Sequence, residues 1–474
     1  MGSKYLIKCL VLSLFLFLPV YKTSSATYQD YSSKLLKIIP SKARKNSKLG
    51  VVVKSLINKK KIFEYNSDKL FIPASNQKVI VSTVALSLLK SKFRFKTEFY
   101  AGGEIRNGIL HGGLYVKGYA DPTINTESLR LIAQQFRHKG LKQINGDLYL
   151  DDSYFDKIKY PIGWKDKWKN DFYSPPISSL SLNYNNFEVV AVPSKNRTKV
   201  IVSTEPPYSG LKIINSARLR KKKNSITARW AEGKNQLIVS GNLYTYSKGT
   251  RFKLPVKYPA LYFGAVLKDE LKKQGIALNG DVKISIVPRW ANLYHTYSSD
   301  TLDEIINVYN KKSVNIIGEN LIKTLGAEYI GVPGTWANGR KIISLFLNKI
   351  GIKNGFKIID GSGLSLLNRV SPNAMADVLE YAFHNKDVGL DFITSLPVAG
   401  IDGTLKKRFK GPDVKGRIVA KTGYLKNVRA LSGYVFTKTG DVLVFSILSN
   451  GLGVEAKKFQ SDLLAELVTC CELN

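Results

Sequence analysis

The stretch from Asn76 to Lys90 is apolar on almost every face of a helix, and it constrains the fold more than any other part of the chain. A helix that is hydrophobic nearly all round has to be buried, so it requires a sizeable domain around it. The chain has 474 residues, of which 44% are hydrophobic. This length exceeds what a single hydrophobic core usually supports, so we expect two or three domains.

The first 26 residues have the pattern of an export signal. Lys4 and Lys8 give a positively charged start, Cys9 to Val20 form an apolar run, and small residues end at Ala26. The apolar run is shorter than the roughly 20 residues of a membrane-spanning helix. We therefore expect a signal peptide at residues 1–26, with an uncleaved anchor as the alternative. The protein is expected to be exported, to the periplasm or the cell envelope.

The patterns of helix and strand divide the remaining chain into a β-rich block between two parts of one domain. From residue 93 to 288, short alternating runs are separated by Gly, Pro and Asn turns. After that block, four helical stretches lead into three strand-like runs and a final helix. Helices beside a terminal antiparallel sheet predict an α+β domain formed by residues 27–92 and 289–474, with residues 93–288 inserted.

The net charge of +36 is large, but the basic residues are scattered along the chain and are mostly lysine. No basic helix with interleaved aromatic residues, zinc-finger spacing or RNA-binding signature accompanies them. Nucleic acid is therefore not an expected partner. Anionic cell-wall polymers or lipid headgroups suit a basic surface equally well, and a lysine-rich source genome is a further explanation.

Histidines and cysteines give no sign of a metal site or a disulfide framework. The four histidines are far apart in the sequence, which removes the ligands of a zinc peptidase and the base of a Ser-His-Asp triad. Cys470 and Cys471 are neighbours and cannot join distant segments. We expect no metal and no cofactor.

Three short motifs occur in an order that predicts one acyl-transfer site. Ser75 and Lys78 lie three residues apart at the start of the buried helix, so their side chains share a face. The lysine can take the hydroxyl proton if burial and neighbouring positive charge keep it neutral. Further along, Ser313-Val314-Asn315 offers a hydroxyl and an amide that can relay protons and hold the substrate. Lys421-Thr422-Gly423 offers a cation and a hydroxyl for a carboxylate, and its glycine allows close approach of the substrate backbone.

Each motif also occurs elsewhere by chance, and its context separates the copies. Ser-x-x-Lys recurs at Ser87 and Ser209, and Ser-x-Asn recurs at Ser181. Lys438-Thr439-Gly440 repeats the third motif in a turn between two strands, where such residues are ordinary hairpin chemistry. Only Ser75 follows a Pro-Ala pair and opens a buried helix.

Beyond these motifs, the sequence resembles the D-Ala-D-Ala carboxypeptidases and endopeptidases among the low-molecular-mass penicillin-binding proteins of class C. The resemblance covers nearly the whole chain after the signal. It rests on Pro73 to Lys78, Gly118 to Pro122 (with Ala120 where the family usually has glycine), Asp360 to Ser365, Ser395 to Gly400 and Asp402 to Leu405. It implies a penicilloyl-serine-transferase fold with extra domains inserted after the nucleophile helix.

The resemblance also implies how the enzyme forms an acyl-enzyme. Ser75 is the nucleophile, Lys78 is the general base, and Ser313 and Asn315 assist proton transfer. The implied substrates are peptidoglycan stem peptides, and the implied inhibitors are β-lactams such as penicillin.

The same resemblance assigns the substrate-binding strand. Lys421 and Thr422 are expected to receive the terminal D-Ala carboxylate, next to Gly423. The backbone N–H groups of Ser75 and Tyr424 form the expected oxyanion hole. Tyr424 stands where the family commonly has Thr or Ser, which removes one expected hydrogen bond to the carboxylate.

Two other functions share the fold. A β-lactamase needs a deacylating water and is usually compact, and the long insertion argues against it. A non-catalytic wall-binding protein is the other alternative, and the intact motifs argue against loss of activity. The sequence leaves open the balance between carboxypeptidase and endopeptidase, the diamino acid of the stem peptide and the oligomeric state.

Overall fold

The computed structural model describes residues 25–46, 48–221 and 224–469. The expected signal peptide lies outside the described residues except for Ser25 and Ala26, which begin helix α2 (Ser25–Lys37). Cys470 and Cys471 also lie outside them. In the described part of the chain, no helix combines the length and the apolar character that crossing a membrane requires.

A five-stranded antiparallel sheet joins the beginning and the end of the chain. Its strand order is β2-β1-β24-β23-β22. Strand β22, which carries Lys421, lies at the edge of this sheet. The strands are β1 (Leu49–Ser55), β2 (Lys61–Tyr65), β22 (Ile418–Leu425), β23 (Val428–Phe436) and β24 (Val442–Asn450).

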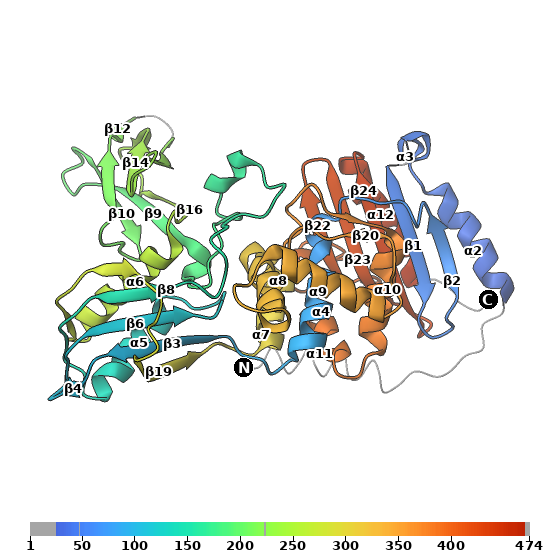
Figure 1. Ribbon diagram of the computed structural model, residues 1–474. Coiled ribbons are helices and arrows are strands. Elements are labelled where there is room, and N and C mark those ends of the chain that lie inside the picture. The colour runs from blue at the N-terminus through green and yellow to red at the C-terminus, as the bar shows by residue number, and fades with distance from the viewer. Residues whose placement is uncertain (1–24, 47, 222–223, 470–474) are drawn as a thin grey trace.

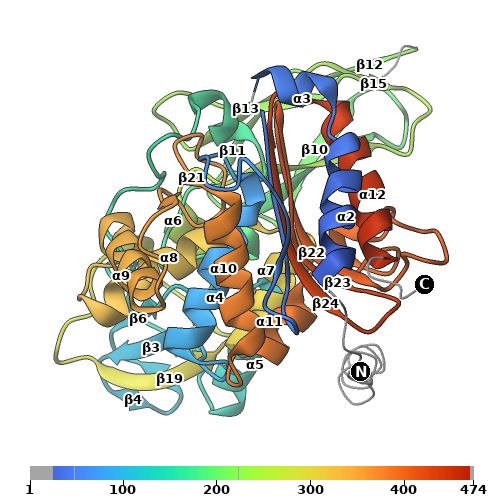
Figure 2. The ribbon, with the colours of Figure 1, turned by 90° about the vertical axis from the view of Figure 1, so that its right-hand side faces the viewer.

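Helices cover both faces of this sheet and give three layers (Figure 2). Helices α2 and α12 (Val454–Val468) pack on one face around one buried hydrophobic cluster. The larger cluster lies on the other face, where helix α4 (Gln77–Leu89) is surrounded by later helices. The remaining helices are α3 (Ser41–Asn46), α7 (Leu302–Lys312), α8 (Asn315–Tyr329), α9 (Trp336–Lys349), α10 (Pro372–His384) and α11 (Gly389–Ser395).

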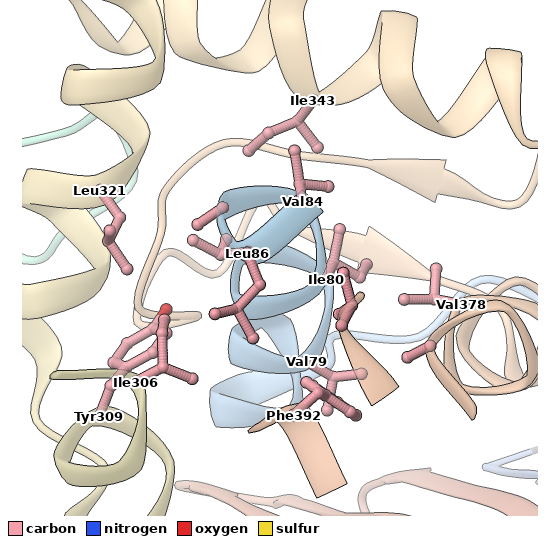
Figure 3. Packing of buried hydrophobic residues seen from close by; sticks show 14 of the residues in the cluster. Val79, Ile80, Val84, Leu86, Ile306, Tyr309, Leu321, Ile343, Val378 and Phe392 are labelled. Carbon is pink, nitrogen blue, oxygen red and sulfur yellow. The ribbon is translucent and has the colours of Figure 1, made fainter. Parts of the chain in front are cut away.

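Helix α4 is the buried helix that the sequence predicts. Val79 and Val84 are fully buried, and Figure 3 shows Ile343, Val378 and Phe392 from neighbouring helices around it. Because every face of α4 contacts apolar side chains, its position is fixed on all sides. The α+β fold class is confirmed, and α4 is a rigid base for the residues at its start.

The chain between α4 and α7 forms a second body, drawn at the left of Figure 1. Its main sheet has the order β18-β8-β6-β3-β19, and α5 (Thr126–His138) and α6 (Pro259–Lys273) share its hydrophobic cluster. The strands of this sheet and of the small sheet beside it are β3 (Lys96–Gly102), β4 (Ile105–Arg106), β5 (Ile109–Leu110), β6 (Gly113–Gly118), β7 (Gln143–Ile144), β8 (Leu148–Asp151), β17 (Ala277–Leu278), β18 (Val282–Ile284) and β19 (Asn292–Ser298).

The rest of the insertion forms three smaller sheets. They contain β9 (Asn186–Pro193), β10 (Val200–Glu205), β11 (Lys212–Asn215), β12 (Arg218–Arg220), β13 (Thr227–Trp230), β14 (Gln236–Ser240), β15 (Asn242–Tyr244) and β16 (Thr250–Pro255). The boundary expected at residue 288 falls before β19. Because β19 pairs along its length with β3, we propose that the insertion ends near Ser298 instead.

One segment of the insertion, residues 152–185, reaches the helices of the first body. Phe155 forms a parallel bridge with Gly334, and Asp156 accepts a 2.7 Å hydrogen bond from Lys323 on α8. The segment includes the short helices η2 (Asp166–Asn170) and η3 (Asn183–Asn185). The short elements of the first body are η1 (Ala74–Asn76), β20 (Phe356–Lys357), β21 (Arg369–Val370) and η4 (Gly403–Leu405).

Candidate active site

Ser75 lies in η1, a single tight turn that runs directly into α4. The preceding residue, Ala74, has φ +46°, a left-handed conformation that is costly for a residue with a Cβ. Gly363 and Gly423 pack against this turn. A Cβ at Gly363 would lie 1.8 Å from the Ala74 carbonyl oxygen, and one at Gly423 would lie 3.2 Å from the Ser75 nitrogen. The surrounding backbone thus holds the serine in a strained turn.

Lys78 is fully buried one turn after Ser75. Its ammonium group Nζ lies 3.1 Å from Ser75 Oγ and donates to Asn315 Oδ1 at 2.8 Å and to the Ser362 carbonyl at 2.5 Å. Burial lowers the pKa of Lys78 to about 7, although the charges of Asp360 and Glu319 oppose the shift. An amine with this pKa is neutral in a large fraction of molecules near pH 7, as a general base requires.

Ser313 and Asn315 lie at the junction of α7 and α8. Ser313 ends α7 in the left-handed conformation, with φ 58° and ψ 38°, and Asn315 is the first residue of α8. The amide of Asn315 is held at both ends, because its Oδ1 accepts from Lys78 and its Nδ2 donates to the Tyr173 carbonyl at 2.8 Å. Tyr173 belongs to the insertion, so the insertion fixes the orientation of this amide.

Lys421 brings the edge strand β22 into the same site. Its side chain is fully buried, and its Nζ donates to Ser313 Oγ at 2.9 Å. Asn76 Nδ2 donates to the Lys421 carbonyl at 2.6 Å, which joins the strand to the turn that carries Ser75. Burial, and then the charge of Lys78, lower the pKa of Lys421 well below its usual value.

The remaining three predicted site residues lie further along β22. Thr422 Oγ1 lies 2.7 Å from Thr404 Oγ1, and Gly423 packs against the turn that carries Ser75. Tyr424 is 67% exposed, and the guanidinium of Arg429 lies 4.1 Å from the centroid of its ring. Of these three residues, Gly423 is the one that lies directly against the turn that carries Ser75.

A known protein family matches nearly the whole of this chain. The model of the family described as D-Ala-D-Ala carboxypeptidase 3 (S13) covers residues 32–470. The chain belongs to the S13 family. The resemblance inferred from the motifs is therefore confirmed, and the S13 enzyme is a D-Ala-D-Ala carboxypeptidase, a serine hydrolase of the penicillin-binding type.

Curated relatives and solved structures agree with the S13 assignment. The chain is 29% identical to D-alanyl-D-alanine carboxypeptidase DacB of Haemophilus influenzae over 423 residues, 87% of each protein. It is 30% identical over 463 residues to a D-alanyl-D-alanine carboxypeptidase of an Actinomadura species, covering 93% of this chain and 85% of that protein.

The crystal structure of penicillin-binding protein 4 (dacB) from Haemophilus influenzae superposes with a TM-score of 0.81 at 28% identity, covering 92% of this chain and 99% of that one. The penicilloyl-serine-transferase fold is thus confirmed. A second structure of that Haemophilus protein is complexed with a β-lactam.

The duplicate motifs make their contacts elsewhere in the S13 enzyme. Ser87 lies near the end of α4, and Ser181 donates to the Ser178 carbonyl at 2.9 Å. Ser209 is in the insertion, where its hydroxyl donates to the Ala265 carbonyl at 3.4 Å. Lys438 forms a 2.6 Å ion pair with Asp413 at the turn between β23 and β24. The eight predicted site residues come together, and these copies do not join them.

Three residues that support the site lie outside the sequence motifs. Glu319 and Tyr309 contact the loop that begins at Asp360, and Trp164 from the insertion donates to Asp360 Oδ2 at 2.8 Å. The Asp360 to Ser365 block is a family feature of the sequence, but its contacts are visible only in the structure. Only Glu319 could have been found from the sequence. It lies four residues after Asn315 on the same helix, so the two side chains share a face of that helix.

Proposed function

We propose that Ser75 is the nucleophile with which this S13 enzyme removes the terminal D-Ala from peptidoglycan stem peptides. The observation that carries the proposal is the buried ammonium of Lys78, which contacts Ser75 Oγ, Asn315 Oδ1 and the Ser362 carbonyl. A neutral amine in that position can take the proton of the serine hydroxyl.

Acylation then proceeds from the positions of the side chains. As Lys78 accepts the proton, Ser75 Oγ attacks the carbonyl carbon of the D-Ala-D-Ala bond. The N–H groups of Ser75 and Tyr424 stabilise the oxyanion of the tetrahedral intermediate. When the intermediate collapses, the C–N bond breaks and the amine of the leaving D-Ala takes a proton, passed from Lys78 through Ser313.

Deacylation reverses these roles with water. A water molecule loses a proton to the same base and attacks the acyl carbonyl, and Ser75 recovers its proton as the ester bond breaks. The products are the shortened stem peptide and free D-Ala. Asn315 keeps its amide directed at Lys78 throughout, because the Tyr173 carbonyl holds the other end of that amide.

The carboxylate of the terminal D-Ala is assigned to β22. Lys421 and Thr422 face the site from this strand, and a carboxylate beside Lys421 favours the protonated lysine, which opposes the effect of its burial. Hydrogen bonds between charged groups contribute about 1.5–3 kcal/mol, so this contact supports both affinity and orientation. Tyr424 stands where the family commonly has Thr or Ser. Its hydroxyl lies at the far end of the ring, so it cannot replace the hydrogen bond that a Thr or Ser hydroxyl would donate to the carboxylate from close to the strand.

β-Lactams acylate the same serine in this proposal, and the fate of the adduct distinguishes the two alternative functions. A carboxypeptidase keeps the penicilloyl adduct for a long time, a β-lactamase loses it rapidly, and a wall-binding protein never forms it. The contacts of Lys78 support formation of the adduct and so disfavour the wall-binding alternative. The insertion of nearly 200 residues remains the argument against a compact β-lactamase.

We also propose that the enzyme is exported and acts in the periplasm or at the cell envelope, since residues 1–26 have the composition of a signal peptide. Its net charge of +36 favours contact with anionic wall polymers or lipid headgroups. Cell fractionation at low and high salt tests both points.

The decisive experiment for the function is the incubation of purified protein with a pentapeptide that ends in D-Ala-D-Ala. We expect release of one D-Ala per peptide, together with a stable adduct on incubation with fluorescent penicillin. Rapid loss of the label would favour the β-lactamase, and the absence of both products would favour the wall-binding protein. Parallel digestion of cross-linked wall fragments measures the endopeptidase share.

A further inference from the structure

The loop from Asp360 to Ser365 contributes a carbonyl group directly to the general base. The carbonyl oxygen of Ser362 accepts the 2.5 Å hydrogen bond from Lys78 Nζ. The neighbouring Gly361 carbonyl accepts a 2.6 Å hydrogen bond from the hydroxyl of Tyr309. The position of this loop therefore decides whether the ammonium is held toward Ser75.

Glu319 holds that loop from helix α8. Its Oε1 accepts from the Ser362 N–H at 2.7 Å, and its Oε2 accepts from the Gly361 N–H at 3.1 Å. The indole N–H of Trp336 donates to the same Oε2 at 2.7 Å. The carboxylate thus binds the peptide N–H groups of two successive residues, and Ser362 is the residue whose carbonyl contacts Lys78.

Three N–H groups donate to Glu319, and its side chain is fully buried. Burial, and then repulsion from Asp360, raise the pKa of Glu319, and hydrogen bonds from the Ser362 side chain, the Trp336 side chain and the Gly361 backbone oppose that rise. The hydrogen-bond donors favour the ionised carboxylate, whereas burial beside Asp360 favours its protonated form.

Within the described residues, the charged and titratable groups that face Lys78 come from four elements. Lys421 lies on β22, Asp360 on the loop, Glu319 on α8, and the ring of Tyr309 on α7 has its centroid 5.5 Å from Lys78 Nζ. Two buried lysines therefore face two buried carboxyl groups. On the other side of Glu319, Lys323 lies over the Trp336 ring, with its Nζ 4.2 Å from the centroid. Lys323 is already paired with Asp156 at 2.7 Å.

We propose that Glu319 is a positioning residue that holds the Ser362 carbonyl against Lys78 and, through its buried negative charge, sets how readily Lys78 is protonated. It does not touch the reacting atoms. This inference rests on the proposed role of Lys78 as general base and assigns a further residue to the same reaction.

Asp360 is less suited than Glu319 to the role of setting how readily Lys78 is protonated. Its carboxylate accepts from the N–H groups of Gly363 and Ser365, from the Asn368 amide and from Trp164. It therefore joins the loop to itself and to the insertion, and its loss would disturb the fold. Glu319 bonds directly to the peptide N–H of the residue whose carbonyl contacts Lys78.

The charge of Glu319 has a direct consequence for the pH dependence of acylation. The base must be neutral, so the acylation rate rises with pH through the pKa of Lys78. When Glu319 is ionised, its negative charge raises that pKa against the effect of burial. Replacing the carboxylate by a neutral amide should therefore move the acid limb of the profile to lower pH, by about one unit.

The test measures the rate of acylation by a fluorescent penicillin from pH 5 to pH 9. Glu319→Gln should shift the acid limb to lower pH and lower the plateau rate, because a less basic amine is a weaker base. Glu319→Asp keeps the charge, so its acid limb should stay near that of the wild type even if its rate falls.

Glu270→Gln is the matched control, since Glu270 is also buried on a helix but lies in the insertion and pairs with Lys273. Its profile should equal that of the wild type.

A folded Glu319→Gln variant with an unshifted acid limb would overturn the inference, since a purely structural role lowers the rate without moving the limb. If that variant does not fold, Glu319→Asp decides, and a limb displaced to lower pH in this charge-retaining variant overturns the inference. A wild-type protein that forms no adduct at any pH would instead refute the proposed function. The two failures are therefore distinguishable.

Discussion

Lys421 donates a 2.9 Å hydrogen bond to Ser313, although the two residues lie 108 positions apart in the chain. The bond joins the edge strand of the sheet to the junction of two helices on its face. It places a buried cation at the end of the site where the leaving D-Ala carries its carboxylate in the proposed mechanism. The same ammonium group therefore serves both the proton relay and substrate binding.

The first prediction concerns the two Lys-Thr-Gly copies. Lys421→Ala should lower kcat/KM for a D-Ala-D-Ala peptide by about tenfold to hundredfold, because a charge-assisted hydrogen bond to the carboxylate is lost. Lys438 is partly exposed and pairs with Asp413, and such surface pairs contribute about 1 kcal/mol or less. Lys438→Ala is thus the matched control and should leave kcat/KM nearly unchanged. Equal effects of the two substitutions, or the reverse order, would contradict the assignment of β22.

The second prediction concerns the pH dependence of the wild-type enzyme. Because burial lowers the pKa of Lys78 to about 7, the acylation rate should rise with pH around neutrality and level off above it. An ordinary lysine would instead give a rate that continues to rise toward pH 10. Stopped-flow acylation by a chromogenic β-lactam, measured across this range, distinguishes the two profiles.

The third prediction concerns the chemical nature of the base. Lys78→Arg should be nearly as damaging to acylation as Lys78→Ala, because a guanidinium stays protonated and cannot act as a base. Circular dichroism and thermal melting check that each variant is folded. An arginine variant that acylates at near the wild-type rate would show that Lys78 supplies only positive charge.

Much of this site could be predicted from the sequence because its signals are local. The all-apolar stretch predicts a buried helix, and α4 is buried on all sides. Ser75 and Lys78 share one turn of chain, so their contact results from helical geometry alone. The order of the later motifs and the family resemblance then lead to Ser313 and Lys421.

The contacts that support the site could not be predicted in the same way. Glu319 and Trp164 bind groups on a distant loop, and no periodicity in the chain reports such pairings. The strand β19 is equally hard to predict, since its pairing with β3 spans almost 200 residues. Residues 152–185 belong to the β-rich block by sequence, yet in space they hold Asn315 and the Asp360 loop.

The fourth prediction concerns that contact between the two bodies. Trp164→Phe leaves the buried Asp360 without one of its donors, which should lower the free energy of unfolding by about 1–3 kcal/mol. The acylation rate should fall as well, because the same loop carries the Ser362 carbonyl. Urea denaturation and acylation kinetics measure the two effects.

Trp290→Phe is the control for this fourth prediction. Trp290 also lies in the insertion, but its side chain is 64% exposed, and a phenylalanine keeps its contact with the ring of Tyr115. This variant should unfold and acylate like the wild type. A Trp164→Phe variant with the same stability and acylation rate as this control would show that the indole bond to Asp360 contributes nothing.

The most direct measurement of the central claim is peptide mapping of the penicilloyl adduct by mass spectrometry. The wild-type protein should carry one penicilloyl group on Ser75, and Ser75→Ala should carry none while it unfolds at a similar temperature, because only one hydroxyl oxygen is lost. An adduct that persists in Ser75→Ala, or that maps to Ser87 or Ser209, would contradict the assignment of the nucleophile.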